Sequence, residues 1–155
     1  MAYRSPKKEV LRVKRAVNHI IKKLDVKYVV QVFPIAEKSG EELTADSEND
    51  QDAILQVCRS NRDKQDKNVF LVFVNVKHIN ALNRKQVLRH VFHEICHIIT
   101  WEYTDMIETC LKHVKAGPLK EQLLDDMYNI RENVTYNLER TMGPHVLPQL
   151  DWNEP

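Results

Sequence analysis

The spacing of hydrophobic residues predicts an amphipathic helix over residues 7–24, near the start of the chain. Apolar residues recur there every three or four positions, which places them on one helix face, while lysines and arginines fill the other. The apolar positions are Val10, Leu11, Val13, Ala16, Val17, Ile20, Ile21 and Leu24. We therefore expect this helix to lie with one face on a hydrophobic core.

Three segments rich in β-branched and aromatic residues predict a small sheet. Residues 28–33 form the first predicted strand, which Pro34 ends. Residues 53–58 and 69–76 are separated by a charged, turn-like run, so we expect them to form a hairpin. Because residues 69–76 are almost continuously apolar, their strand is expected to be covered on both faces and to lie centrally in the sheet.

The second half of the chain predicts three more helices. Asn83 suits the N-cap of the first, and the breaks at Gly117-Pro118 and Gly143-Pro144 bound the last. The predicted ranges are 84–101, 104–114 and 119–141. The acidic, polar stretch over 37–52 is expected to be an exposed loop. Helices and strands together predict an α+β fold.

Composition narrows the class of protein. A chain of 155 residues, 43% of them hydrophobic, suits a single domain over 1–155 with a real core, and residues 145–155 are expected to be an irregular tail. The net charge of +1 gives no strong signal for nucleic acid or for an anionic membrane. No apolar run approaches the roughly 18 residues that span a bilayer, and no secretion signal is evident. Three cysteines without C-x-x-C spacing argue against a disulfide scaffold, so we expect a soluble, cytoplasmic protein.

Residues 93–97 carry the pattern H-E-x-x-H inside a predicted helix. Because a helix turns about 100° per residue, His93 and His97 lie on one face, where both imidazoles can bind one Zn²⁺. Glu94 then projects beside the metal, where its carboxylate can take a proton from a zinc-activated water. A chance match is the alternative, but both histidines face away from the helix's apolar side, which is formed by Leu88, Val91, Phe92, Ile95, Ile98 and Ile99.

A catalytic zinc usually has three protein ligands and one open position, so the motif requires a third ligand. Glu132 is the preferred candidate, because it lies with Tyr128 and Tyr136 on a polar stripe opposite the apolar side of the last predicted helix. His113 and Asp125 are the alternatives. A carboxylate at Glu132 or Asp125 could also simply solvate an exposed helix face.

With Glu132 downstream, the motif resembles that of the zincin superfamily of zinc metallopeptidases, and within it the glutamate-type gluzincins. The chain is most similar to compact metallopeptidases of phages and mobile elements, in the style of the ImmA/IrrE-like group. The resemblance covers residues 69–138, and the motif is its only highly specific part. It implies that His93, His97 and Glu132 bind one catalytic Zn²⁺ and that Glu94 is the general base. The implied zincin-like fold has an N-terminal helix, a small twisted sheet, an active-site helix and a C-terminal helix that carries the third ligand.

The chain also departs from this family. Larger gluzincins carry an asparagine before the ligand glutamate, whereas Arg131 stands there, and Tyr136, one turn after Glu132, is our candidate for the donor that stabilises the oxyanion. The implied function is hydrolysis of a peptide or protein substrate, bound in extended form along an edge strand. One alternative is an SprT-like protease of DNA-bound proteins with His113 as third ligand, and another is a non-catalytic zinc-binding module for protein interaction. The sequence leaves cleavage specificity and oligomeric state open.

Overall fold

The structure is a computed structural model that describes residues 7–35, 53–60 and 68–153. Within these residues it contains five α-helices and one three-stranded sheet, so the fold is mixed α+β. The expected loop over 37–52 lies outside the described residues. The chain divides into two compact units, Met1–Glu94 and Ile95–Pro155. That it acts as a single domain stays a prediction.

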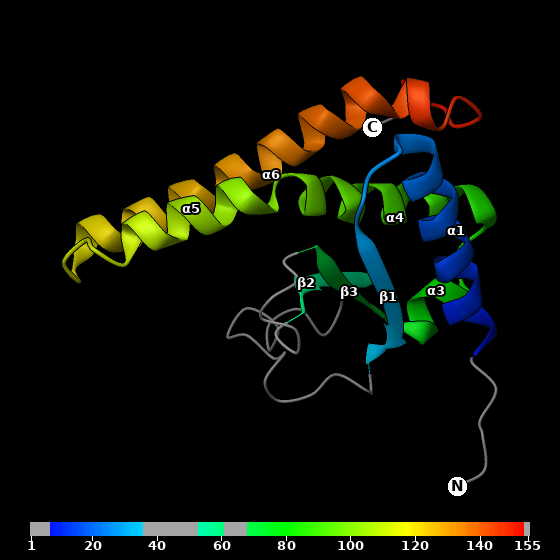
Figure 1. Ribbon diagram of the computed structural model, residues 1–155, viewed down its shortest axis with the longest axis horizontal. Coiled ribbons are helices and arrows are strands. Elements are labelled where there is room, and N and C mark those ends of the chain that lie inside the picture. Colours follow the sequence, from blue (N-terminus) through cyan, green and yellow to red (C-terminus); the bar gives the residue numbers. More distant parts are fainter. Residues whose placement is uncertain (1–6, 36–52, 61–67, 154–155) are drawn as a thin grey trace, which may run out of the picture. The chain divides into compact units, whose positions relative to one another are not determined.

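Helix α1 spans Lys8–Leu24, as the hydrophobic pattern predicts. It ends where Asp25 adopts a left-handed conformation with φ of 52°, one of the usual ways to terminate a helix. The helix lies against strand β1 (Val29–Pro34) (Figure 1). The side chains that it buries are Val10, Val13, Ala16, Val17 and Ile20.

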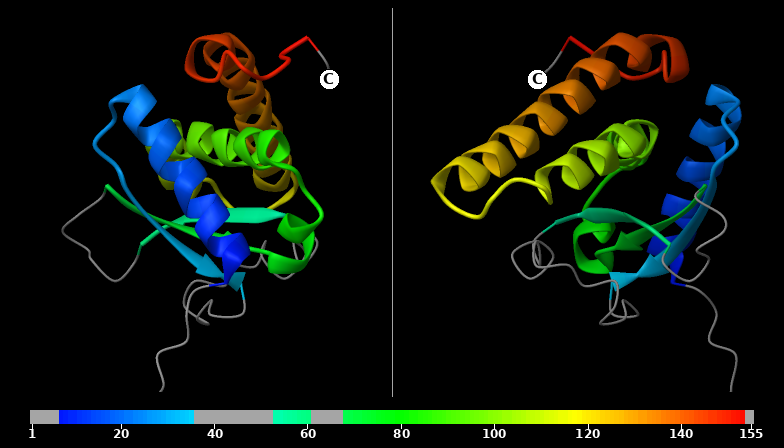
Figure 2. Two further views of the ribbon diagram at one scale, coloured as in Figure 1. Left: turned by 90° about the vertical axis from the view of Figure 1, so that its right-hand side faces the viewer. Right: turned by 60° about the vertical axis from the view of Figure 1, so that its left-hand side comes forward.

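The sheet has the order β1-β3-β2, with β2 at Leu55–Arg59 and β3 at Val69–Val74 (Figure 2). Strand β3 pairs antiparallel with β2 and parallel with β1. Five of its six residues are buried, so both faces of this strand are covered. The predicted pairing of the second and third strands and the central place of the third are therefore both confirmed.

A short helix, α3 at Val76–Asn80, follows the sheet and was not predicted. Five residues are too few for helical periodicity to emerge from the sequence. Arg12 of α1 fixes its carboxyl end: Nη1 donates to the carbonyl of Ile79 at 3.2 Å, and Nη2 donates to that of Leu82 at 2.6 Å. These bonds satisfy carbonyls that a helix terminus leaves without partners.

Helix α4 spans Arg84–Ile99 and continues across the boundary of the two units. Asn83 caps it as predicted, because the backbone N–H of Gln86 donates to Asn83 Oδ1 at 2.9 Å and the N–H of Asn83 donates to Gln86 Oε1 at 2.9 Å. The apolar side predicted for this helix is largely buried. Its buried members are Leu88, Val91, Phe92, Ile95 and Ile98.

The second unit contains an antiparallel pair of helices, α5 (Trp101–Leu111) and α6 (Pro118–Val146) (Figures 1 and 2). The predicted end of α6 before Gly143 is wrong, because the helix continues for another turn. Pro144 is tolerated so close to the helix end, where it disturbs few hydrogen bonds. No helix of the described residues is long and apolar enough to cross a membrane.

The chain after α6 has no regular secondary structure but is packed. Leu147, Leu150 and Trp152 are buried, and Trp152 Nε1 donates to the carbonyl of Leu147 at 2.9 Å. The indole ring lies against Gly143, where a Cβ would come within 2.6 Å of it. An irregular tail was expected over 145–155. Among the described residues it is irregular only from Leu147 onward, and there it is packed against α6.

The burial of α6 differs from its hydrophobic pattern. Ile130 and Val134, on the apolar side, are 56% and 46% exposed, whereas Thr135 and Glu139, on the opposite stripe, are 0% and 7% exposed. Burying polar groups is costly unless they are hydrogen-bonded. The helix therefore buries two polar residues, Thr135 and Glu139, at a cost that their contacts must offset, while it exposes two apolar ones.

Candidate metal centre

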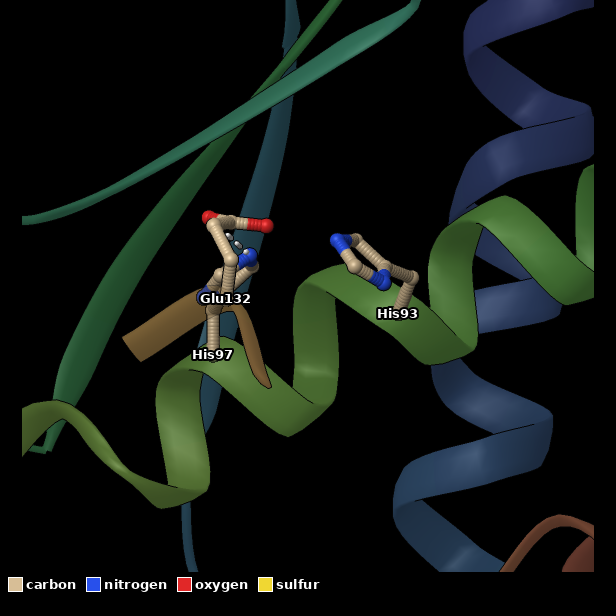
Figure 3. A group of neighbouring side chains, drawn as sticks. All are labelled: His93, His97 and Glu132. Atoms are coloured by element: carbon tan, nitrogen blue, oxygen red, sulfur yellow. Dashed lines mark ion pairs between the residues drawn. The ribbon is translucent and has the colours of Figure 1, made fainter. Parts of the chain in front are cut away.

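Helix α4 presents the two motif histidines. His93 and His97 lie one turn apart and leave the same side of the helix (Figure 3). Both are half-buried, and the side chain of His97 is only 11% exposed. Their placement follows directly from the four-residue spacing.

Glu132 approaches His97 from α6. The Nε2 atom of His97 lies 3.4 Å from Oε1 of Glu132, and the Glu132 side chain is 37% exposed (Figure 3). One potential ligand atom from each of His93, His97 and Glu132 lies within 4.8 Å of the other two. Within the described part of the chain, this is the only such group of histidine, cysteine and acidic residues.

The separations are compatible with a zinc ion. With bonds of about 2.0–2.1 Å, the ligands of a tetrahedral zinc are about 3.3 Å apart. The His97–Glu132 distance of 3.4 Å already matches this value. The remaining separations, at most 4.8 Å, need to shorten by roughly 1.5 Å, which side-chain rotation can supply. Two imidazoles and one carboxylate also form a known catalytic zinc set with one open position.

Thr135 contacts the other nitrogen of His97. Its Oγ1 lies 3.1 Å from Nδ1 of His97, although 38 positions separate the two residues. If Nδ1 carries the proton, Thr135 accepts its hydrogen bond and Nε2 is left with a lone pair for a metal. Thr135 was not predicted from the sequence, which pointed instead to the hydroxyls of Tyr128 and Tyr136 beside Glu132. The available signal was its position three residues after Glu132, on the same side of the helix.

Arg131 is the unusual neighbour of this group. Its Nη2 lies 3.9 Å from Oε1 of Glu132, and its guanidinium carbon lies 5.1 Å above the ring of Tyr128. The buried Nε of Arg131 has no hydrogen-bond partner among the described residues. A cation here competes with a metal for the Glu132 carboxylate, so a simple charge pair between Glu132 and its neighbours is the alternative to a metal site.

Tyr136 lies one turn beyond Glu132 on α6. Arg140 Nη1 donates to its hydroxyl oxygen at 2.9 Å, and the guanidinium of Arg140 stacks over its ring at 5.3 Å. The phenolic hydrogen therefore stays available to donate to another group. The side chain is 44% exposed, which leaves it accessible to a ligand, and its catalytic role stays a prediction.

The other candidates lie outside the group. His113 is exposed just beyond the C-terminal end of α5, and Asp125 is exposed two turns before Glu132, about 10 Å along α6. Glu94 is half-buried on α4 beside the first histidine. Cys96 is fully buried, in keeping with a packing role.

Comparison with known proteins adds no relative. No family model matches the sequence, and no curated protein or solved structure is similar to it. The function is therefore inferred from the residues and the geometry of this chain.

Proposed function

We propose that this protein is a zinc-dependent metallopeptidase that hydrolyses peptide bonds in a peptide or protein substrate. The observation that carries the proposal is the convergence of His93, His97 and Glu132, with ligand atoms within 4.8 Å of one another. A chance H-E-x-x-H match would have no reason to meet a carboxylate from another helix. The catalytic zinc set requires such a third ligand.

The residues of the chain have separate roles in the proposed reaction. When bound, zinc is a Lewis acid that lowers the pKa of water and polarises a carbonyl group. Glu94, next to the first ligand, accepts the proton of the attacking water and returns it to the leaving amine. Thr135 holds His97 in the tautomer that offers Nε2.

We also propose that one side chain and one edge strand contact the substrate. Tyr136, whose hydroxyl retains its hydrogen, donates to the oxyanion as the carbonyl becomes tetrahedral. An extended peptide pairs with an edge strand of the three-stranded sheet, where β1 and β2 are the outer strands. We further propose that the fold is zincin-like and that the protein is a cytoplasmic peptidase of the gluzincin type.

The decisive experiment compares wild type with Glu94→Gln. We expect both to bind about one zinc ion per chain, while hydrolysis of a labelled unfolded protein falls by several orders of magnitude in the variant, because the base is lost. Glu102→Gln, an exposed change of the same kind on α5, is the matched control and should retain full activity. Equal hydrolysis by wild type and Glu94→Gln would refute the mechanism.

A non-catalytic role is the second candidate, and Arg131 favours it. Its guanidinium lies 3.9 Å from Glu132, where it can neutralise the carboxylate without a metal. A wild-type protein that binds no zinc at micromolar concentrations would support this role. The SprT-like alternative depends on His113, which lies outside the group of potential ligands, so we do not adopt it.

A further inference from the structure

A pocket in the first unit lies between α1 and the beginning of α4. It has a volume of about 450 Å³, within the range of small-molecule sites. Its lining combines apolar and cationic side chains, and its residues are Arg12, Arg15, Ala16, His19, Arg84, Val87 and Leu88. Ala16, Val87 and Leu88 are buried, whereas Arg15, His19 and Arg84 are exposed.

The cationic residues of the pocket have no carboxylate partner within residues 7–35, 53–60 and 68–153. Among the residues that the structure describes, no ion pair joins Arg15, His19 or Arg84 to an acidic group. The first turn of α4 also lacks an acidic residue and begins with Arg84 and Lys85. Cations at this end of a helix are electrostatically unfavourable. Folding alone therefore does not account for the concentration of positive charge.

Arg12 adds a fixed guanidinium. Its bonds to the carbonyls of Ile79 and Leu82 hold the side chain in one position. A guanidinium carries five N–H donors, and these bonds use two of them. The remaining N–H groups of Arg12 can donate to a ligand. Because this guanidinium is already held in place, a ligand does not incur the entropic cost of immobilising it.

We propose that this pocket binds a small molecule that carries a phosphate monoester. Arginine forks match the oxygens of phosphate, and a dianion suits three guanidinium groups better than a carboxylate does. The buried floor of Ala16, Val87 and Leu88 suits an apolar or planar part of the same molecule. The site is separate from the proposed peptidase chemistry, because none of its residues is a proposed zinc ligand or catalytic group.

The test uses calorimetric titration with inorganic phosphate, adenosine 5′-monophosphate and adenosine. We expect saturable binding of the first two and none of adenosine. Arg15→Gln and Arg84→Gln should each weaken binding about tenfold or more, the usual effect of losing one charged hydrogen-bonding partner. Lys22→Gln, an exposed change of equal charge on α1 outside the pocket, should change it less than twofold.

Circular dichroism checks that each variant folds. We expect Arg15→Gln and Arg84→Gln to fold normally, because both arginines are exposed. Absence of saturable phosphate binding would overturn the proposal, as would equal weakening by Lys22→Gln. A fourth titration, with a single-stranded oligonucleotide that has no terminal phosphate, distinguishes a phosphate monoester from the phosphodiester backbone of a nucleic acid. Binding of the oligonucleotide alone, with a steep dependence on salt, would indicate a nucleic-acid surface and would also overturn it.

Discussion

The bond between Thr135 and His97 makes a prediction about metal affinity. Thr135→Val keeps the shape of the side chain but removes the oxygen that lies 3.1 Å from Nδ1 of His97. We expect zinc affinity to fall about 10- to 100-fold, as for other groups that orient a ligand. The free energy of unfolding should fall by only about 1 kcal/mol, the cost of one unmade hydrogen bond. Competition with a chromogenic chelator measures the affinity.

Thr135→Ser is the matched control for this change. It keeps the hydroxyl and removes only a methyl group, so it should retain most of the zinc affinity. If the valine and serine variants lose affinity equally, Thr135 acts through packing and the proposed hydrogen bond has no role in metal binding.

The assignment of Glu132 as third ligand is tested on its own helix. Glu132→Ala removes one of three proposed ligands, and we expect zinc affinity to fall about 100-fold or more. Asp125→Ala removes an exposed carboxylate from the same stripe and should have little effect. His113→Ala should also bind zinc normally. Loss of zinc binding in His113→Ala with retention in Glu132→Ala would reverse the assignment.

For single residues, the sequence predicted the arrangements that follow from helix geometry alone. The shared face of His93 and His97 depends only on their four-residue spacing. Glu132 was predicted because of its place on a polar stripe. The contact of Thr135 with His97 was not predictable, because it depends on the rotation of α6 about its own axis. That rotation is set by packing, and the sequence pattern, with Ile130 and Val134 on the apolar side, pointed to the wrong buried face.

The last turns of α6 make a prediction about stability. In Gly143→Ala, the added Cβ would lie 2.6 Å from the indole ring of Trp152. Alanine gains about 1 kcal/mol of helix propensity over glycine, but overpacking a core costs about 1–3 kcal/mol. We therefore expect a net destabilisation of up to about 2 kcal/mol, measured by urea unfolding. Asn137→Ala, at an exposed position of the same helix, should be neutral or slightly stabilising.

If Gly143→Ala is as stable as Asn137→Ala, Trp152 does not anchor the chain after α6. The chain after α6 would then be an irregular segment that Trp152 does not hold in place. Gly143 and Pro144 usually end a helix, but α6 continues through both of them, and there is a physical reason for this. A glycine can be required by a ring that packs on it, and a proline near a helix end costs little.

Element types were more predictable than their ends or their packing. Long, strongly periodic segments such as α1 and α4 were predicted to within a few residues, because burial of one face dominates their sequence. Strand β3 was predicted to be central from its continuous apolar character. The five-residue helix α3 was missed, because it is too short to show helical periodicity and its carboxyl end is bonded by Arg12, 67 and 70 positions away.

The whole molecule should respond to zinc through its stability. A ligand that binds only the folded state stabilises it by about 2.7 kcal/mol at 100 times its dissociation constant. Because His97 and Glu132 belong to different helices, zinc bound by both ties α4 to α6 and is lost on unfolding. We expect zinc to raise the melting temperature of wild type and Asp125→Ala by several degrees, and a chelator to reverse the rise. The same addition should leave Glu132→Ala unchanged, and magnesium should have no effect on any of the three, because it prefers an octahedral set of oxygen ligands. An equal rise in Glu132→Ala would place the zinc elsewhere in the chain.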